Sequence, residues 1–525
     1  MERVAPRQLL YENQLPVAIE STSSRRIFFP EGGSKYGPTG AGANPNIVRI
    51  PINSNDLLDC QESFLQFKFT NTGANTLGLD IGVPFIRRLR IESGGTTLED
   101  INEYGKLYAQ LVACQASQGA ITEATLTTGG VNGNNTDITP MTALTDDRYN
   151  QTDGAIATAV LGAFTGNSQD ANTAANTTAI TNAKAAATTV IRDAVRAASN
   201  ATNAEIKANV DALTLNAAGV HNQNSQLAQN ASVYYNIPLV SGLLNMEKYL
   251  PLVMMNAGLT IELEFDDVGT AGSFSANDNN CAWEIDDVRY VAHMISLQRD
   301  FYDKLRLVME GSGGVLQLAG TTYRHFQGDA ADATQTTVAI PAKVKSIKGM
   351  LFTMNEPADK THKSRFGVSN SIPNGLEEYQ FRIGSVVYPP TAVKVNQGTG
   401  GFANTYRNKG EAYQELRKLF GTLGDYTHGG VLLNSNTYLA ATNTGTARQG
   451  AAGVVNPILN PFGMSFESFP RTALESGVNS ADRNLSINLD IKRSQAPATN
   501  TTVNVWAMCD AIYYVNLDGS VSVSV

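Results

Sequence analysis

Residues 259–290 read LTIELEFDDVGTAGSFSANDNNCAWEIDDVRY, and the alternation at the start of this stretch decides the fold. Apolar and polar residues alternate from Leu259 and Ile261 onward, which is the period of a strand with one face on a core and one face in water. The same alternation returns near the C-terminus, from Leu485 and Ile487 onward. Two matching strands so far apart in the chain indicate that a larger structural unit is duplicated.

A second echo follows each of these strands. The pattern W-x-x-x-D-x-x-Y begins at Trp283 and again at Trp506, and the chain contains no other tryptophan. Both echoes occur in the same order and at nearly the same spacing, so the sequence predicts a duplicated domain. We predict that the following residues of the echoes belong to the structural core: Trp283, Tyr290, Trp506, Tyr513, Leu259, Ile261, Leu485 and Ile487.

Two shorter echoes lie upstream. The text RIES at 90–93 resembles RIGS at 382–385, and the pattern G-x-x-Y-x-x-L starts at Gly105 and at Gly410 within helical text. A capping box that ends at Glu99 predicts that the helix containing Gly105 has already begun by that residue. All four echoes keep the same order in both copies, which supports the duplication.

The echoes also predict the domain boundaries. The first copy contains a long segment, 119–232, that is rich in Ala, Thr, Asn and Gly, with one credible helix at 183–213. We expect this segment to project outward from the first domain, the alternative being a flexible loop. The predicted organisation is an N-terminal arm at 1–46, a first domain at 47–296, a charged connector at 297–314 and a second domain at 315–525.

The bulk composition argues against several classes of protein. A net charge of −9 disfavours an extended nucleic-acid-binding face, which needs clustered Lys and Arg. No apolar run approaches the length of a membrane-spanning helix, and the N-terminal text lacks the apolar core of a signal peptide. The four cysteines are scattered with no C-x-x-C, so we expect reduced thiols in a protein made in a reducing compartment.

No combination of residues predicts a catalytic, cofactor-binding or metal site. The chain has no H-E-x-x-H, G-x-S-x-G or Walker sequence, and its five histidines never pair at ligand spacing. The acidic neighbours Asp266-Asp267 and Asp286-Asp287 would point to opposite faces of a strand, so neither pair is built to act as one site. We therefore expect a protein that is not an enzyme and that carries no cofactor.

Two short motifs carry a resemblance to a known family. Residues 380–390 contain QFRIGS followed by YPP, and residues 466–479 contain FESFP followed by SGVN, just before the second copy of the alternating strand. In a chain that is written twice, this combination resembles the double jelly-roll major capsid proteins, a lineage that runs from tailless membrane-containing phages through adenovirus. The motifs are most similar to those of polinton-like virus and virophage capsid proteins.

The resemblance implies an all-β fold of two tandem eight-stranded jelly-roll β-sandwiches, with short flanking helices and a large loop insertion in the first. It implies a structural major capsid protein of the virion that forms homotrimeric, pseudo-hexagonal capsomers in the icosahedral shell of a double-stranded DNA virus. The implied partners are the same chain in its own trimer and in neighbouring capsomers, penton and minor capsid proteins, and an internal membrane reached by the N-terminal arm. Sequence-specific nucleic acid is not among them.

A different class of function fits the same β-rich text. A secreted or virion-borne β-sandwich that binds carbohydrate or a receptor would also have Gly- and Asn-rich loops. It would predict an aromatic platform or paired acids in a cleft, and a signal peptide if the protein were cellular. Negative-stain microscopy of the purified protein separates the two hypotheses, because only the capsid protein would form hexagonal trimers or shells.

Overall fold

The structure is a computed structural model of the chain. Residues 1–20, which open the expected arm, lie outside the residues that it describes. So do almost all residues of the expected insertion at 119–232, including the helix expected at 183–213. The described residues are 21–38, 44–73, 77–79, 83, 85–115, 226–227, 229–246, 248–266, 273–274, 282–311, 313–355, 371–395, 409–421, 438, 460–468, 477–481, 485–497 and 499–525.

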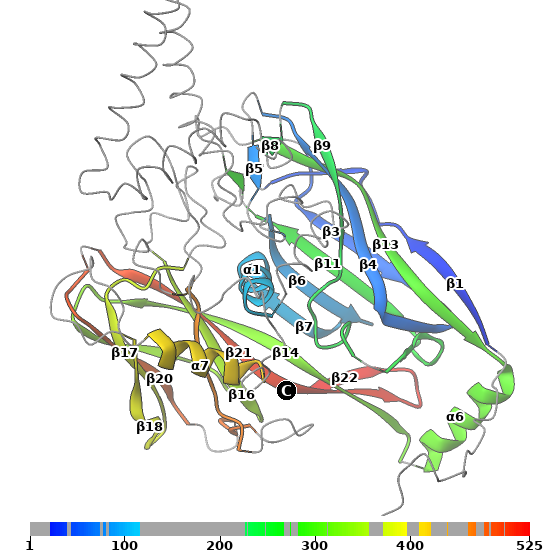
Figure 1. The fold of residues 1–525 in the computed structure, drawn as a ribbon. Coiled ribbons are helices and arrows are strands. Elements are labelled where there is room, and N and C mark those ends of the chain that lie inside the picture. The colour runs from blue at the N-terminus through cyan, green and yellow to red at the C-terminus, as the bar shows by residue number, and fades with distance from the viewer. Residues whose placement is uncertain are drawn as a thin grey trace, which may run out of the picture.

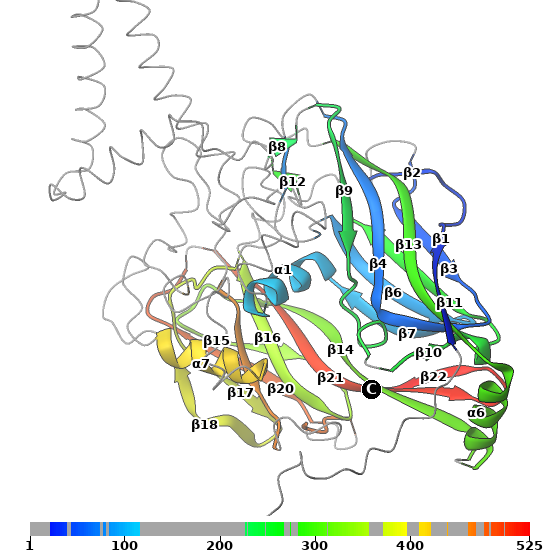
Figure 2. The ribbon, with the colours of Figure 1, turned by 45° about the vertical axis from the view of Figure 1, so that its right-hand side comes forward.

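The first sandwich is built from eight strands in two antiparallel sheets (Figures 1 and 2). One sheet has the order β1-β13-β4-β9 and the other β3-β11-β6-β7, so that by rank in the sequence the orders are 1-8-3-6 and 2-7-4-5. This is the strand order of a jelly roll. The strands are β1 Ser21–Phe28, β3 Ile47–Ile52, β4 Leu57–Asn71, β6 Ile86–Ser93, β7 Thr96–Asn102, β9 Ser232–Ile237, β11 Leu259–Phe265 and β13 Trp283–Leu297.

The second sandwich repeats the same topology. Its sheets have the orders β14-β21-β16-β19 and β15-β20-β17-β18, which again are 1-8-3-6 and 2-7-4-5 by rank. The fold class expected from the sequence, two tandem jelly rolls, is therefore confirmed. The strands are β14 Val315–Ala330, β15 Gln335–Ile340, β16 Ile347–Asn355, β17 Leu376–Ile383, β18 Val386–Lys394, β19 Phe462–Ser465, β20 Ile487–Arg493 and β21 Thr501–Asn516.

Helices occupy matching places in the two copies. Helix α1 (Tyr104–Gln115) and helix α7 (Lys409–Leu419) each follow the fifth strand of their sandwich and precede the sixth. Helix α6 (Arg299–Gly311) occupies most of the expected connector, between β13 and β14. Within the described ranges, no helix combines the length and apolar character that crossing a bilayer requires.

Smaller elements complete the described chain. A 3-10 helix, η3 (Leu252–Met254), follows strand β10, and a short terminal strand, β22, pairs with β21. Three short strands, β5, β8 and β12, form a small sheet of their own. The bounds of the short strands are β2 Lys35–Tyr36, β5 Leu77–Leu79, β8 Gln226–Leu227, β10 Leu250–Pro251, β12 Ser273–Phe274 and β22 Val521–Ser524.

The strand registers agree with the sequence echoes. In the first sandwich Ile261 of β11 pairs with Ile91 of β6, and in the second Ile487 of β20 pairs with Ile383 of β17. Each of these pairs joins a residue of the alternating strand to a residue of the RI-x-S text, so two independent echoes meet at the same point of each sheet. The predicted duplication is thus confirmed at the level of single residue pairs.

Each sandwich has a core of aromatic rings between its two sheets. In the first, Phe67 stacks on Tyr235 with ring centroids 5.1 Å apart, and Trp283 stacks on Phe69 at 5.5 Å. In the second, the ring of Phe352 contacts Tyr379 and Phe381 on the opposite sheet and Phe462 on its own sheet. Ring pairs of this kind stabilise a core by about 0.5–1.5 kcal/mol each beyond the effect of area burial.

Two sequence predictions about boundaries were wrong. Residues 21–28 were expected to belong to an arm, but they form β1, which pairs with β13 from Ser21 opposite Leu297 to Phe28 opposite Tyr290. The sequence STSSRR gives no strand signal, because β1 lies at the edge of the sheet with its polar side chains exposed and no apolar residue alternates with them. The capping box ending at Glu99 was also misread, since residues 96–102 form strand β7 and α1 begins only at Tyr104.

Candidate functional site: the junction between the two sandwiches

The two sandwiches meet along one buried surface, which we call the junction. From the first sandwich it is formed by β7, α1 and the loop at 239–246, and from the second by β14 and β21 (Figures 1 and 2). The terminal strand β22 also runs against β7. This surface therefore helps to fix how the two jelly rolls sit relative to each other.

The outward orientation of Trp506 follows from strand pairing. Phe352 faces the interior of the second sandwich, where its ring contacts Phe381 of the opposite sheet. Paired residues of an antiparallel sheet share a face, so Val505, opposite Phe352, also faces inward. The next residue, Trp506, pairs with Leu351 and must face out of the sandwich.

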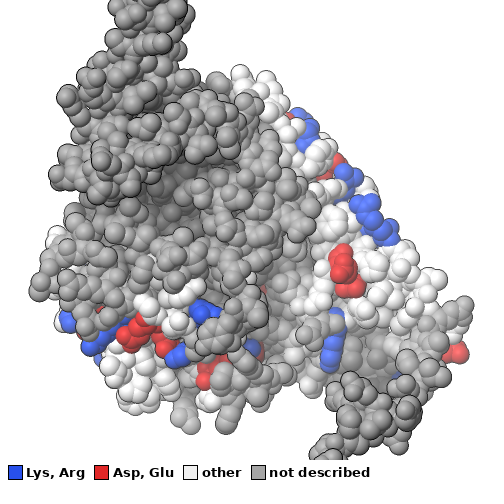
Figure 3. Space-filling model, in the orientation of Figure 1, with Lys and Arg blue, Asp and Glu red and all other residues white. Residues whose placement is uncertain are grey.

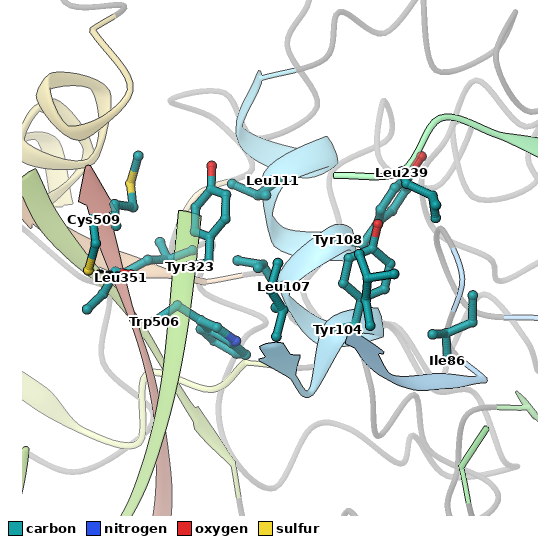
Figure 4. Packing of buried hydrophobic residues seen from close by; sticks show 14 of the residues in the cluster. Ile86, Tyr104, Leu107, Tyr108, Leu111, Leu239, Tyr323, Leu351, Trp506 and Cys509 are labelled. Atoms are coloured by element: carbon teal, nitrogen blue, oxygen red, sulfur yellow. Dashed lines mark hydrogen bonds between the residues drawn. The ribbon is translucent and has the colours of Figure 1, made fainter. Parts of the chain in front are cut away.

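Trp506 is nevertheless fully buried, because the first sandwich covers it. Its indole Nε1 donates a hydrogen bond to the backbone oxygen of Asn102, at the end of β7, at 3.4 Å. Figure 4 shows Leu107 and Leu111 on the side of α1 that is turned toward Trp506 and Tyr323 of the second sandwich. Burying a tryptophan at such a surface contributes much of the contact energy, because the side chain is large.

A buried carboxylate holds the loop that enters the junction. Glu99 of β7 is 3% exposed, and its Oε1 accepts a hydrogen bond from the backbone N–H of Gly242 at 2.8 Å. Its Oε2 accepts one from the N–H of Leu243 at 3.2 Å and another from the Ser241 hydroxyl. Hydrogen bonds to an ionised acceptor are stronger than neutral ones, so Glu99 fixes the turn at 241–243.

The backbone of this turn lies directly on the second sandwich. A Cβ placed on Gly242 would come within 2.8 Å of the Thr321 carbonyl oxygen and 2.9 Å of the Tyr513 hydroxyl. A Cβ on Gly320 of β14 would collide with the Gly242 carbonyl oxygen. Only glycine permits this approach at either position, so the two residues let the sandwiches pack backbone to backbone.

Two buried tyrosines of the second sandwich, Tyr323 and Tyr513, lie close enough to Glu99 to feel its charge. Burial raises the pKa of Tyr323 to about 12, and the negative charge of Glu99 adds to this effect. Burial and the same charge raise the pKa of Tyr513 well above its usual value. Both phenols therefore stay neutral at physiological pH beside the Glu99 carboxylate.

His325 lies at the edge of the junction. It pairs with Trp506 across β14 and β21, its ring centroid is 5.3 Å from the indole, and its Nε2 lies 3.1 Å from the Asn504 side-chain oxygen. Burial lowers the pKa of His325; Glu103 and Asn504 oppose the shift, and Lys106 adds to it. The imidazole is thus held in its neutral form between the two sandwiches.

A second contact between the two sandwiches involves the turn that follows β21. The turn after β21 reaches the loop after η3, where the N–H of Asn256 donates to the Gly519 carbonyl oxygen at 3.1 Å. The Asn256 side-chain amide donates to the Asp518 carbonyl oxygen. The C-terminal hairpin of the second sandwich is therefore anchored on the first.

The structure places the predicted core residues in three settings. Trp283, Tyr290, Leu259 and Ile261 are buried in the first sandwich, and Ile487 is buried in the second. Leu485 is only partly buried and precedes the first residue of β20.

Trp506 and Tyr513 belong to the junction rather than to a sandwich interior. The expectation that Trp283 and Trp506 are equivalent was wrong: Trp283 stacks on Phe69 inside the first sandwich, whereas Trp506 faces outward. The W-x-x-x-D-x-x-Y pattern therefore recurs in the eighth strand of both sandwiches, but its tryptophan faces inward in the first and outward in the second.

Sequence reasoning missed the residues that make the junction. Glu99 was interpreted as part of a helix cap, and Gly242 and Gly320 were not singled out. One signal was present: α1 reads YGKLYAQLVACQ, apolar on more than one side, and such a helix is covered on more than one side. Within the described ranges, no cluster of His, Cys, Asp and Glu is grouped to hold a metal ion.

No protein-family model and no curated protein matches the chain. Among solved structures it is similar to VP54 of PBCV-1, fitted into a reconstruction of the virophage Sputnik, with 10% identity, a TM-score of 0.51 and 97% of each chain covered. The quasi-atomic model of the PBCV-1 virus capsid gives the same values. A cryo-EM structure of the Sputnik virophage has 10% identity and a TM-score of 0.49 over 100% of this chain and 93% of its own. The chain thus has the double jelly-roll fold of major capsid proteins.

Proposed function

We propose that the protein is a structural major capsid protein that forms trimeric, pseudo-hexagonal capsomers in the icosahedral shell of a double-stranded DNA virus. The observation that carries the proposal is the junction, which joins two sandwiches of identical topology into one unit along the chain. Three such units around an axis present six similar sandwiches, so one sequence can tile a nearly hexagonal lattice. The fold likeness to the PBCV-1 capsid protein, over almost the whole of both chains, supports this reading.

The chemistry of the described residues suits a structural role rather than an enzymatic one. The buried polar groups of the junction hold backbone, as Glu99 does, or stay neutral, as Tyr513 does. A buried polar contact such as that of Glu99 with the turn at 241–243 gives a surface a unique geometry, which a shell component needs. The partners that follow from the proposal are further copies of the chain, penton and minor capsid proteins, and an internal membrane reached by the N-terminal residues.

We place synthesis of the chain in a reducing compartment of the host and its final location in the virion. The thiols of Cys60, Cys114 and Cys509 are free. Burial raises the pKa of Cys60 to about 12, which suppresses the reactive thiolate. The described part of the chain thus holds together without disulfide bonds, as expected of a protein that folds in a reducing environment.

Multi-angle light scattering and negative-stain microscopy of the full-length protein test the proposal together. Three times the chain mass of 56.1 kDa, with particles of hexagonal outline, is the expected result. A monomer at micromolar concentration, with no larger assembly in the images, would exclude a capsid role. Binding of the monomer to a glycan array would then favour the carbohydrate- or receptor-binding alternative.

A further inference from the structure

Arg493, the last residue of β20, is the one buried cation among the described residues, and it is 2% exposed. Leu489 and Ile491 of the same strand face the core of the second sandwich, so the alternation of β20 turns Arg493 inward as well. Lys492 between them faces outward, where it pairs with Glu378 at 3.0 Å. A cation therefore occupies a position of the strand at which alternation predicts an apolar residue.

The loop between β14 and β15 closes over this side chain. The backbone N–H of Arg493 donates to the Thr334 carbonyl oxygen at 2.7 Å. Its Nη1 donates to the carbonyl oxygens of Ala331 at 2.9 Å and Ala333 at 3.1 Å. Asp332 lies in the same loop, but it is exposed, and no ion pair joins it to Arg493 within the described chain. The guanidinium thus holds the loop through its carbonyl groups and gains no counter-charge from it.

These contacts use only part of the hydrogen-bonding capacity of the side chain. A guanidinium carries five N–H donors, of which Nη1 supplies the two that meet the loop. The Nε and Nη2 atoms of Arg493 are buried and have no hydrogen-bond partner among the described residues. These two nitrogens share one edge of the planar group, and their N–H bonds form the fork that binds two oxygens of a carboxylate or phosphate. The edge that is best suited to an anion is therefore the edge left unpaired.

Other cations of the described chain have a negative partner. Three further arginines have a buried nitrogen without a hydrogen-bond partner, but each of them forms an ion pair with a carboxylate. The pairs are Arg90 with Glu92 at 3.0 Å, Arg289 with Asp287 at 3.0 Å and Arg382 with Asp490 at 2.8 Å. On the surface the two signs also lie side by side, as Figure 3 shows over α7, where Lys418 pairs with Glu415. Arg493 differs from all of these in having no carboxylate partner among the described residues.

The charge of Arg493 is not removed by deprotonation. Burial lowers the pKa of its guanidinium to about 10, which still leaves the group protonated at neutral pH. A charge taken out of water destabilises the folded state unless it is paired and hydrogen-bonded. A negative ligand on Nε and Nη2 would supply both the missing counter-charge and the missing acceptors.

We infer that Arg493 binds a small free oxyanion, which accepts hydrogen bonds from Nε and Nη2 through two of its oxygen atoms. The ligand is a carboxylate or a phosphate, because both present two oxygens at the spacing of the guanidinium fork. A free ion fits this place better than a side chain of another protein, because the loop at 331–334 covers the guanidinium. That loop consists of Ala, Asp, Ala and Thr, so a small displacement of it admits an ion. The inference does not depend on the proposed capsid role.

Thermal unfolding of the full-length protein with added anions tests the inference. The starting buffer is sodium HEPES at neutral pH, because its bulky sulfonate cannot enter the site. Sodium phosphate or sodium acetate is then added at constant ionic strength, and the two salts distinguish phosphate from carboxylate as the bound class. A ligand that binds only the folded chain raises the melting temperature, and we expect a rise of at least about 3 °C with one or both anions. No rise with either anion would overturn the inference.

Two variants on adjacent residues locate the site. Arg493→Met removes the guanidinium and keeps much of the side-chain volume, so the rise in melting temperature should disappear. Lys492→Met is the matched control, since it removes the neighbouring cation on the outer face of the same strand. The control should keep the full wild-type rise. A rise that persists in Arg493→Met would place the bound anion elsewhere and would overturn the inference.

A third variant keeps the test decisive if Arg493→Met does not fold. Arg493→Lys retains the positive charge but lacks the two-pronged edge of the guanidinium, so it should bind the anion at least about tenfold more weakly than the wild-type protein. Isothermal titration calorimetry with the anion that raised the melting temperature measures this difference, and the wild-type protein should show a single site per chain. Equal affinities in the two proteins would contradict recognition by Nε and Nη2.

Discussion

Gly242 and Gly320 belong to different sandwiches, and each occupies a place where the other side of the junction leaves no room for a Cβ atom. The contact is backbone against backbone, so it cannot adapt by rotating a side chain. At each position the α-hydrogen of glycine occupies the space where any other residue would carry its Cβ, so the close packing of the two segments requires glycine at both positions. The junction is therefore sensitive to the smallest possible substitution.

Gly320→Ala should destabilise the junction by about 1–3 kcal/mol, the usual cost of overpacking a tight site. Calorimetry is the measurement, and the two sandwiches are expected to melt in separate transitions once the junction is weakened. Gly410→Ala on α7 is the matched control, since a Cβ there meets nothing within 4 Å. A single unchanged transition in Gly320→Ala would contradict the close approach.

Glu99→Gln keeps the shape of the side chain but replaces one acceptor oxygen with an amide group that donates. That group would face the N–H donors of Gly242 and Leu243, so one of them loses its partner. Leaving a buried donor unsatisfied costs about 1–3 kcal/mol.

Urea unfolding checks this expectation. Glu264→Gln is the control, because its carboxylate makes only long ion pairs of 3.8 Å on the surface, and its effect should stay within about 0.5 kcal/mol. Equal unfolding midpoints for the two variants would show that Glu99 does not hold the turn.

The pH dependence of stability should report on His325. Its pKa is lowered in the folded state from the ordinary value of 6.5, so around that pH the unfolded chain binds more protons than the folded one. The contribution is complete above pH 6.5 and is lost as the pH falls through that value toward the folded pKa.

Melting temperatures measured between pH 7.5 and 5.0 should therefore fall less steeply in His325→Gln than in the wild-type protein. His293→Gln, on a residue outside the junction, is the matched control and should keep the wild-type slope. An identical slope in all three proteins would mean that His325 is not kept neutral by the junction.

Trp283→Ala and Trp506→Ala should both destabilise the protein by about 3–5 kcal/mol, but at different places. Trp283 packs inside the first sandwich, so its loss should lower the melting of that sandwich alone. Trp506 packs between the sandwiches, so its loss should uncouple them and split the transition. Calorimetry distinguishes these patterns, and identical traces for the two variants would contradict the different placements.

Replacing residues 130–225 with a short Gly/Ser linker should leave the first sandwich folded. All eight strands of that sandwich, and α1, are formed by residues outside this range, so no sheet loses a strand. Soluble expression and a wild-type melting transition are the expected results. Loss of soluble protein would instead place part of the segment in the core.

The sequence predicts the interior of each sandwich better than it predicts the contact between them. A strand such as β11, with one face on a core, must alternate apolar and polar residues, so Leu259 and Ile261 reveal it directly. Strand β1 has no such face, and its polar text does not differ from that of a loop. Boundaries set by an exposed edge therefore cannot be predicted from alternation.

The junction was hidden for a different physical reason. It depends on which segments of the two sandwiches pack against each other. The alternation of apolar and polar residues within one strand carries no information about that packing. Glu99 has the spacing of a helix cap and the burial of a junction residue, and only the paired glycines in the preceding turn, Gly94 and Gly95, indicate a hairpin there. Trp506 shows the same limit, because its local text matches Trp283 while its face does not.

The pairing of β1 with β13 has a consequence for the order of events during synthesis. Ser21 pairs with Leu297, so the first described strand leaves the ribosome long before its partner exists. At about 5–20 residues per second, the wait is on the order of 15–55 s. During that time β1 is a strand without a neighbour, and its sequence of serine, threonine and arginine is one that resists pairing with other nascent chains. The polar composition that makes β1 hard to predict from the sequence thus also disfavours wrong strand pairing until β13 has been synthesised.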